Sequence, residues 1–206
     1  KHLSRQEIRQ AGALSNFADI VRQISSEIRG DTSLSNRVEL NNMKKISITS
    51  KDLPYGINVD DVFWVASAII RREQVRESKD EEIVADIIAA MLLDEMPASS
   101  SNILDEFYSL KAVTKRSMEL EEKIRIQSVD NVKSNFFRVF DEIKELLEIA
   151  GKTFNNLISK DKTFDKVPRY YQIVFLALYK LLVEENKKVN SQYDLLQIMD
   201  GITANI

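Results

Sequence analysis

The sequence predicts an all-α protein, a multi-helix bundle in two lobes with at most one short extended segment. Two observations carry this prediction. Only 5 Gly and 3 Pro occur among 206 residues, so the chain has few of the residues that punctuate turns between short strands. In addition, apolar residues recur at the i, i+3, i+4 and i+7 spacing that marks one face of an α-helix.

Four helices are expected in the N-terminal half. The first covers residues 5–11 and begins with Ser4 and Glu7, a capping box in which side chains and backbone bond each other. The second ends at Gly30, a residue type favoured at helix C-termini. The other two follow an irregular stretch. The apolar faces of the last three helices are Phe17, Ile20, Val21, Ile24 and Ile28, then Val59, Val62, Phe63, Ala66, Ile69 and Ile70, and finally Val84, Ile87, Ile88, Met91 and Leu92.

The irregular stretch covers residues 31–58, where Asn and Ser are frequent. Its segment Leu53–Gly56 is expected to form a turn, and Met43–Thr49 is expected to hold a short strand or extended piece. After it, Ser78 and Glu81 repeat the capping-box pattern, which predicts the start of the fourth helix.

Further helices are expected over residues 102–127, 129–150, 152–159, 169–186 and 191–200. The helix at 169–186 is apolar nearly all round, so we expect it at the centre of the second half. Pro97 and the Ser99–Ser101 run end the fourth helix and suggest a division into two lobes. These are a helical lobe over 1–97 and a helical bundle lobe over 98–206.

Composition limits the possible environments of the chain. It has no Cys, which excludes disulfides and thiolate metal sites and indicates a reducing compartment. We therefore expect a cytoplasmic protein. Its longest apolar run, Ile173–Tyr179, is far shorter than the roughly 20 residues that cross a bilayer, so no membrane partner is expected.

Catalytic and metal-binding motifs are scarce. His2 is the only imidazole, and the five Gly are isolated rather than gathered in a phosphate-binding loop. Carboxylates alone would suit Mg²⁺ or Ca²⁺, but Asp80–Glu82 fall in a predicted first turn, where they complement the helix dipole. We expect no metal site in this segment, and a buried core position for Trp64.

Two basic groups are candidates for binding phosphate. Arg5 and Arg9 lie four residues apart on one helix face, with Gln6 beside them, and forked guanidinium groups suit phosphate oxygens. A secondary basic cluster, of Arg71, Arg72 and Arg76, falls where one predicted helix gives way to the next. For both groups the alternative is a solvated face or ion pairs with nearby acids.

The segment Leu3–Gln10, with the sequence L-S-R-Q-E-I-R-Q, resembles a recurring motif, roughly L-S/N-x-Q-E-I/L-R. That motif belongs to the N-terminal-domain family of GmrSD-type, modification-dependent restriction enzymes, which are ParB/sulfiredoxin-like proteins. Three later stretches, Leu53–Ile57, Phe63–Val65 and Gln74–Val84, resemble one branch of that family in the same order. The resemblance covers about residues 1–110.

The resemblance implies a parent protein with a small ParB-like α/β domain upstream, and we expect this chain to be a segment of that parent. Family members carry in that domain an Asp-Gly-Gln-Gln-Arg motif tied to nucleotide binding and hydrolysis, and some carry or partner with an HNH nuclease. Neither feature is in this sequence. The cofactor of the parent would be a nucleoside triphosphate with Mg²⁺, with none held by this segment. Arg5, Gln6 and Arg9 are the residues expected nearest the nucleotide pocket.

Two functional hypotheses follow. In the first, the chain is the helical portion of a bacterial anti-phage or restriction-type defence protein. It buttresses the nucleotide-hydrolysing ParB-like domain and couples it to DNA or a nuclease effector. The parent would then be a nucleotide-dependent DNA endonuclease or NTPase, and the segment alone no enzyme. In the second, it is a helical protein–protein interaction or oligomerisation module without a catalytic role, and its partner can be a second copy of the chain. Independent DNA binding ranks third, because the net charge is −3.

Overall fold

A computed structural model describes residues 5–12, 15–30, 52–53, 57–95, 100–110, 112–158, 166–189 and 192–201. Over these residues the protein is mostly α-helical, which confirms the predicted fold class. In the described ranges the extended structure is one antiparallel pair, β1 (Asp52–Leu53) and β2 (Ile57–Asn58), with Leu53 opposite Ile57. The expected strand at Met43–Thr49 lies outside these ranges.

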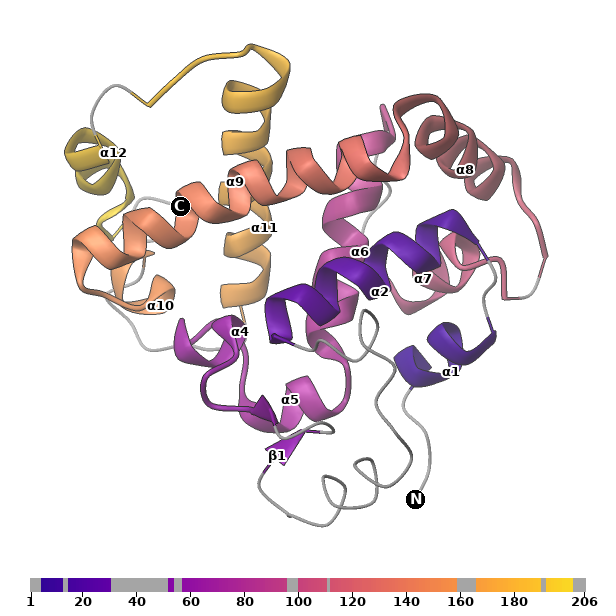
Figure 1. Ribbon diagram of the computed structural model, residues 1–206, viewed down its shortest axis with the longest axis horizontal. Helices are drawn as coiled ribbons and strands as arrows, with labels where there is room; N and C mark the ends of the chain where they lie inside the picture. The colour runs from indigo at the N-terminus through magenta and orange to yellow at the C-terminus, as the bar shows by residue number, and fades with distance from the viewer. Residues whose placement is uncertain are drawn as a thin grey trace.

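The helices cross one another in a bundle rather than running in parallel (Figure 1). The longest helix, α9, lies across α11, and α2 crosses α6 and packs on it. A π-helical turn at Lys180–Glu184 continues α11. In chain order the helices are α1 (Arg5–Gly12), α2 (Asn16–Arg29), α4 (Phe63–Ala66), α5 (Arg72–Arg76), α6 (Lys79–Leu92), α7 (Ser101–Phe107), α8 (Lys115–Gln127), α9 (Val129–Ala150), α10 (Phe154–Ile158), α11 (Val167–Tyr179) and α12 (Gln192–Met199).

The core is continuous across the whole described chain. Helix α6 lies between α2, α8 and α11 and packs against each of them, so buried residues such as Val84 and Ile88 face neighbours on several sides. Buried side chains before and after residues 96–99 belong to the same cluster. The expected division into two lobes near residue 97 stays a prediction.

Helix α11 was expected at the centre of the second half, and one of its faces is exposed. Its Tyr171, Phe175 and Leu178 are buried against the core, and the helix packs on α6 and α9. On the opposite side Ile173 is 51% exposed, and Leu181 in the following π turn is 40% exposed. The more central helix is α6, because it contacts helices from both halves of the sequence.

Aromatic side chains fill the junction of α4, α9 and α11. Trp64 is fully buried, as predicted. Its ring centroid lies 5.2 Å from that of Tyr171, and Phe63 lies 4.6 Å from Phe140, both in edge-to-face arrangements. Such pairs stabilise the core beyond the area they bury. The Trp64 Nε1 and the Tyr171 hydroxyl are buried without a hydrogen-bond partner.

Several helix boundaries match the sequence prediction. Helix α2 ends at Gly30 with φ of 73°, and α9 ends at Gly151 with φ of 58°. Both glycines adopt the left-handed conformation that ends helices at low cost. The expected bounds 129–150 for α9 are those observed.

Two expected helices are broken. The periodic segment 59–70 forms only the single-turn α4, because Ala68 adopts a φ of 54°. The expected helix at 102–127 is divided into α7 and α8, since Ser109 also has a φ of 54°. The apolar residues Val62 and Ile69 are buried nonetheless. The spacing thus predicted burial correctly and backbone conformation incorrectly.

The capping box expected at Ser78 and Glu81 is wrong. Ser78 has a φ of 59° and its side chain makes no cap hydrogen bond. Glu81 pairs with Arg29 of α2 instead of reaching back to the helix start. The other expected capping residue, Ser4, and the expected turn residues Pro54–Gly56 lie outside the described part of the chain.

Candidate functional site

Helix α1 contacts the protein through polar side chains. Gln6 and Arg9 are buried, whereas the apolar Ile8 is 49% exposed. This is the reverse of an ordinary amphipathic helix, which buries its apolar face. The group that holds α1, here named the Arg9 cluster, comprises Arg5, Gln6, Arg9, Glu82, Ser101, Asp105 and Tyr108.

Arg9 is the centre of this cluster and has no exposed surface. Its Nε donates to Asp105 at 2.9 Å, and its Nη1 donates to Glu82 and Gln6 at 3.0 Å each. Its Nη2 donates to the carbonyl and hydroxyl oxygens of Ser101 at 2.8 and 2.7 Å. One guanidinium therefore joins α1 to the first turns of α6 and α7.

Asp105 is shared by two arginines. Arg5 donates to both of its carboxylate oxygens, and Arg5 Nη2 also donates to Asn102 at 3.0 Å. Burial raises the pKa of Asp105, but hydrogen bonds from Arg5 and Arg9 and their positive charges outweigh burial and lower it from its ordinary 3.8. The hydrogen bond with Asp105 is the main cause that raises the pKa of Arg5. The carboxylate is thus held in its charged form.

The lowered pKa of Asp105 predicts how α1 docking depends on pH. Because the folded pKa lies below the unfolded value of 3.8, the unfolded state binds more protons in that range. The contribution of Asp105 is then fully present above about pH 5 and lost as pH falls through the folded pKa. We expect the stability difference between the protein and its Asp105→Asn variant, measured by denaturant unfolding, to be constant from pH 5 to 8 and to shrink below pH 4. A difference that grows on acidification would contradict this.

A second buried ion pair holds the same end of α6. Arg29, in the last turn of α2, donates to both oxygens of Asp80 at 2.7 Å and pairs with Glu81 at 3.0 Å. Asp80 is fully buried. The acidic first turn of α6 therefore receives guanidinium groups from two helices, Arg9 of α1 and Arg29 of α2, in addition to complementing the helix dipole.

The structure brings Arg5, Gln6 and Arg9 together, with their hydrogen bonds directed into the protein. A phosphate contact by these residues stays a prediction, and Arg9 would have to exchange partners to make it. The secondary basic cluster is exposed around α5. There Arg72 forms a forked pair with Asp60 at 2.6 and 2.8 Å, and the backbone N–H of Arg71 donates to Gln74. Arg76 lies in the last turn of that helix.

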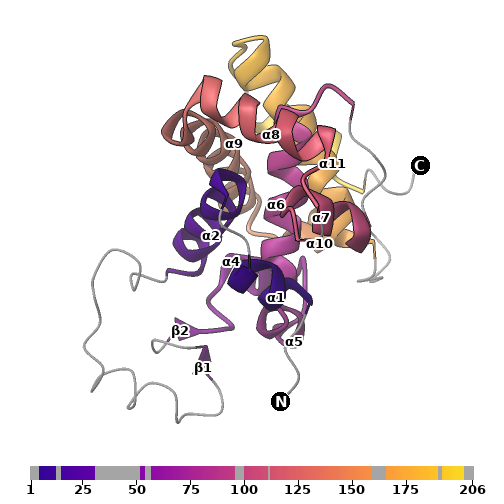
Figure 2. The ribbon, with the colours of Figure 1, turned by 90° about the vertical axis from the view of Figure 1, so that its right-hand side faces the viewer.

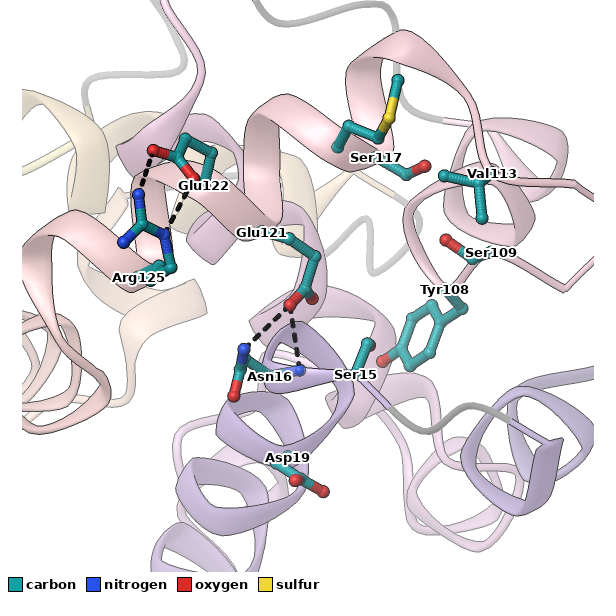
Figure 3. Close-up of a pocket in the computed structure, with 11 residues that line it drawn as sticks. Ser15, Asn16, Asp19, Tyr108, Ser109, Val113, Ser117, Glu121, Glu122 and Arg125 are labelled. Carbon is teal, nitrogen blue, oxygen red and sulfur yellow. Dashed lines mark hydrogen bonds and ion pairs between the residues drawn. The ribbon is translucent and has the colours of Figure 1, made fainter.

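A groove of about 740 Å³ lies beside the Arg9 cluster, between the N-terminus of α2 and helix α8 (Figure 3). Buried Tyr108 lines it, and the Tyr108 hydroxyl accepts a hydrogen bond from Gln6 at 2.9 Å. Glu121 reaches across the groove and accepts the backbone N–H groups of Asn16 and Phe17 at 3.2 and 2.9 Å. The N-terminus of α2 is therefore already capped by a carboxylate of the same chain.

The charges that line the groove are paired within the protein. Asp19 pairs with Arg22 at 2.7 Å, and Glu122 pairs with Arg125 at 2.6 Å. The described residues that line it include no His or Cys, and no group of described side chains is arranged to hold a metal ion. The carboxylates that line the groove have hydrogen-bond or ion-pair partners within the protein.

A second hollow, of about 620 Å³, lies between the end of α6 and the start of α8. Two of its carboxylates have partners within the protein. Glu106 accepts from Thr114 at 2.7 Å and from Arg116 at 2.9 Å, and Asp94 pairs with Lys123 at 3.2 Å. Four carboxylates and two cationic side chains line this hollow, so it is a mainly acidic surface.

The partners of Arg5 and Arg9 were not predicted from the sequence. Asp105 is the most informative omission, because it is a carboxylate next to Leu104 and three residues before Tyr108, on the buried face of α7. A charged residue on an apolar helix face is a signal for a buried ion pair. Which arginine would pair with it could not be inferred, since the partners are about a hundred residues away in sequence.

Comparisons with known proteins add no family to this description. No family model matches the chain, and neither the curated proteins nor the solved structures contain a significant match. Among the described residues no helix is long and apolar enough to cross a membrane. The fold and site therefore define a class only: a mostly α-helical bundle whose N-terminal helix is held by buried charges.

Proposed function

We propose that this chain is the helical portion of a GmrSD-type defence protein, and that it couples an adjoining nucleotide-hydrolysing ParB-like domain to a nuclease effector or DNA. The motif Leu3–Gln10 and the three later stretches support the family. The parent would bind a nucleoside triphosphate with Mg²⁺ outside this segment. The helices themselves would transmit a conformational state rather than carry out chemistry.

The observation that carries this proposal is the buried attachment of α1 through Arg9. A helix held by apolar contacts can slide at low cost, whereas a forked guanidinium with fixed partners has few alternative positions. A shift of α1 would therefore break hydrogen bonds to Glu82, Ser101 and Asp105 together. Such a discrete change of contacts is what coupling between two states requires.

The same geometry refines the proposed phosphate role. Arg5 is 46% exposed along its side chain and shares Asp105 with Arg9. An arriving phosphate would compete with Asp105 for Arg5 first. Arg5 is accordingly the better candidate for a nucleotide contact, with Arg9 the residue that positions α1.

Two variants of the longer protein separate these roles. We expect Arg5→Ala to raise the KM for nucleotide, because a contact to the bound phosphate is lost. We expect Arg9→Ala to lower kcat about tenfold with a smaller change in KM, because the coupling is weakened after binding. Arg125→Ala, which removes an exposed ion pair with Glu122, is the matched control and should leave both constants unchanged.

The outcome decides between the two hypotheses. Unchanged hydrolysis in both variants, together with loss of assembly, would favour the interaction module and reject coupling through α1. A natural start Met next to this segment, without an Asp-Gly-Gln-Gln-Arg element upstream, would reject the proposed family.

An interaction module is the second candidate, and exposed apolar side chains favour it. Besides α11, the stretch from Val113 through α8 exposes Val113, Met118 and Ile126. Direct DNA binding has less support, because the net charge is −3. A basic binding surface would show affinity that falls steeply with salt.

A further inference from the structure

Helix α11 and its π turn carry a stripe of exposed residues spaced four apart. We name it the α11 stripe, and it consists of Arg169, Ile173, Ala177, Leu181 and Glu185. The opposite side of the helix is buried against α6 and α9. The helix lies on the side of the molecule away from β1 and β2 (Figure 2). The stripe therefore faces outward.

The α11 stripe is symmetric about its middle residue. Ala177 is the centre, with Ile173 four residues before it and Leu181 four residues after it. Arg169 and Glu185 stand eight residues away on either side and have opposite charges. An antiparallel copy of the stripe would place apolar residues against apolar residues and each end charge against its opposite.

We propose that the α11 stripe is the interface through which two copies of this chain associate about a two-fold axis near Ala177. Ridges of residues four apart pack against each other in the commonest class of helix contact. A small residue at the crossing point lets the two backbones approach closely. Because a two-fold interface repeats each contact, the Arg169–Glu185 pair forms twice.

The pattern favours a second copy over an unrelated partner. A surface that binds a different protein need not be complementary to itself. In the α11 stripe, both the apolar residues and the end charges are complementary to those of a second, antiparallel copy. In the single chain Glu185 pairs with Lys187 at 2.6 Å, and an exposed pair of this kind exchanges partners at little cost.

The π turn also contributes to the geometry. In an α-helix, residues four apart advance 40° around the axis at each step, so a long stripe winds away from a straight partner. The wider π turn at Lys180–Glu184 has more residues per turn and reduces this drift between Leu181 and Glu185. This inference does not rest on the proposed defence function.

The absence of Cys from the sequence permits a direct test. We expect Ala177→Cys to form a disulfide-linked dimer under mild oxidation, since residues near a two-fold axis meet their own copies. Ala66→Cys, at another exposed helical alanine, is the matched control and should stay mostly monomeric. Equal cross-linking of both variants, or none in either, would overturn the proposal.

Charge reversal tests the antiparallel arrangement separately. Sedimentation should show a concentration-dependent dimer, and Arg169→Glu or Glu185→Arg alone should raise its Kd about tenfold, because each change acts twice. The double variant should restore the original Kd. A monomer at all concentrations up to about 1 mM, or a double variant no better than either single one, would reject the interface.

Discussion

Replacing Arg9 with Ala is expected to lower the free energy of unfolding by about 3 kcal/mol, as breaking a buried ion pair commonly does. The variant leaves Asp105 with Arg5 as its remaining arginine partner and removes the donors to both oxygens of Ser101. Denaturant unfolding measures the loss. Amide hydrogen exchange should locate it in α1, because Arg9 joins that helix to α6 and α7.

A double-mutant cycle separates this interaction from a general effect of truncation. Arg9→Ala and Asp105→Ala should each lower the free energy of unfolding. The double variant should lose clearly less free energy than the sum of the two single losses, because the two residues are in direct contact. Arg125→Ala should have no measurable effect, since that side chain is 71% exposed and its ion pair is on the surface. Additive costs for Arg9 and Asp105 would show that the cluster does not act as a unit.

Replacing Trp64 with Ala is the second large effect that we expect. Removing a fully buried indole costs about 3–5 kcal/mol through lost transfer free energy and the cavity left behind. Its neighbours Phe63, Phe140 and Tyr171 come from three different helices, so they cannot close that space without moving backbone. Thermal unfolding should show a fall of about 10 °C.

Two conservative variants act as controls for this core site. Trp64→Phe keeps an aromatic ring and removes the Nε1 group, which has no hydrogen-bond partner, so it should cost less than half as much. Tyr171→Phe removes a buried hydroxyl that also lacks a partner and should leave stability unchanged or raised. A large loss in Tyr171→Phe would mean that this hydroxyl is paired in solution.

The elements that the sequence predicted well are those marked by two independent signals. For α2, the apolar spacing coincided with Gly30, the residue expected to end the helix. For α9, the apolar spacing was likewise followed by a glycine, Gly151. At residues 59–70 the apolar side chains Val62 and Ile69 were buried, but the backbone was not a continuous helix.

At the candidate site, too, the sequence predicted local geometry but not the tertiary contacts. Sequence placed Arg5 and Arg9 on one helix face, and that placement follows from local geometry alone. Whether the face meets water, phosphate or protein depends on what lies opposite, which local geometry does not specify. The tertiary structure supplied Asp105 and Glu82 from distant parts of the chain.

By itself the sequence determined a mostly helical fold, the burial of most apolar stripes and the face shared by the two arginines, because these depend on neighbours within a few residues. Tertiary structure decided that α6 is central, that α11 keeps an exposed stripe and that Arg9 is buried. Those features depend on which helix packs against which, and that choice is set by contacts between residues far apart along the chain.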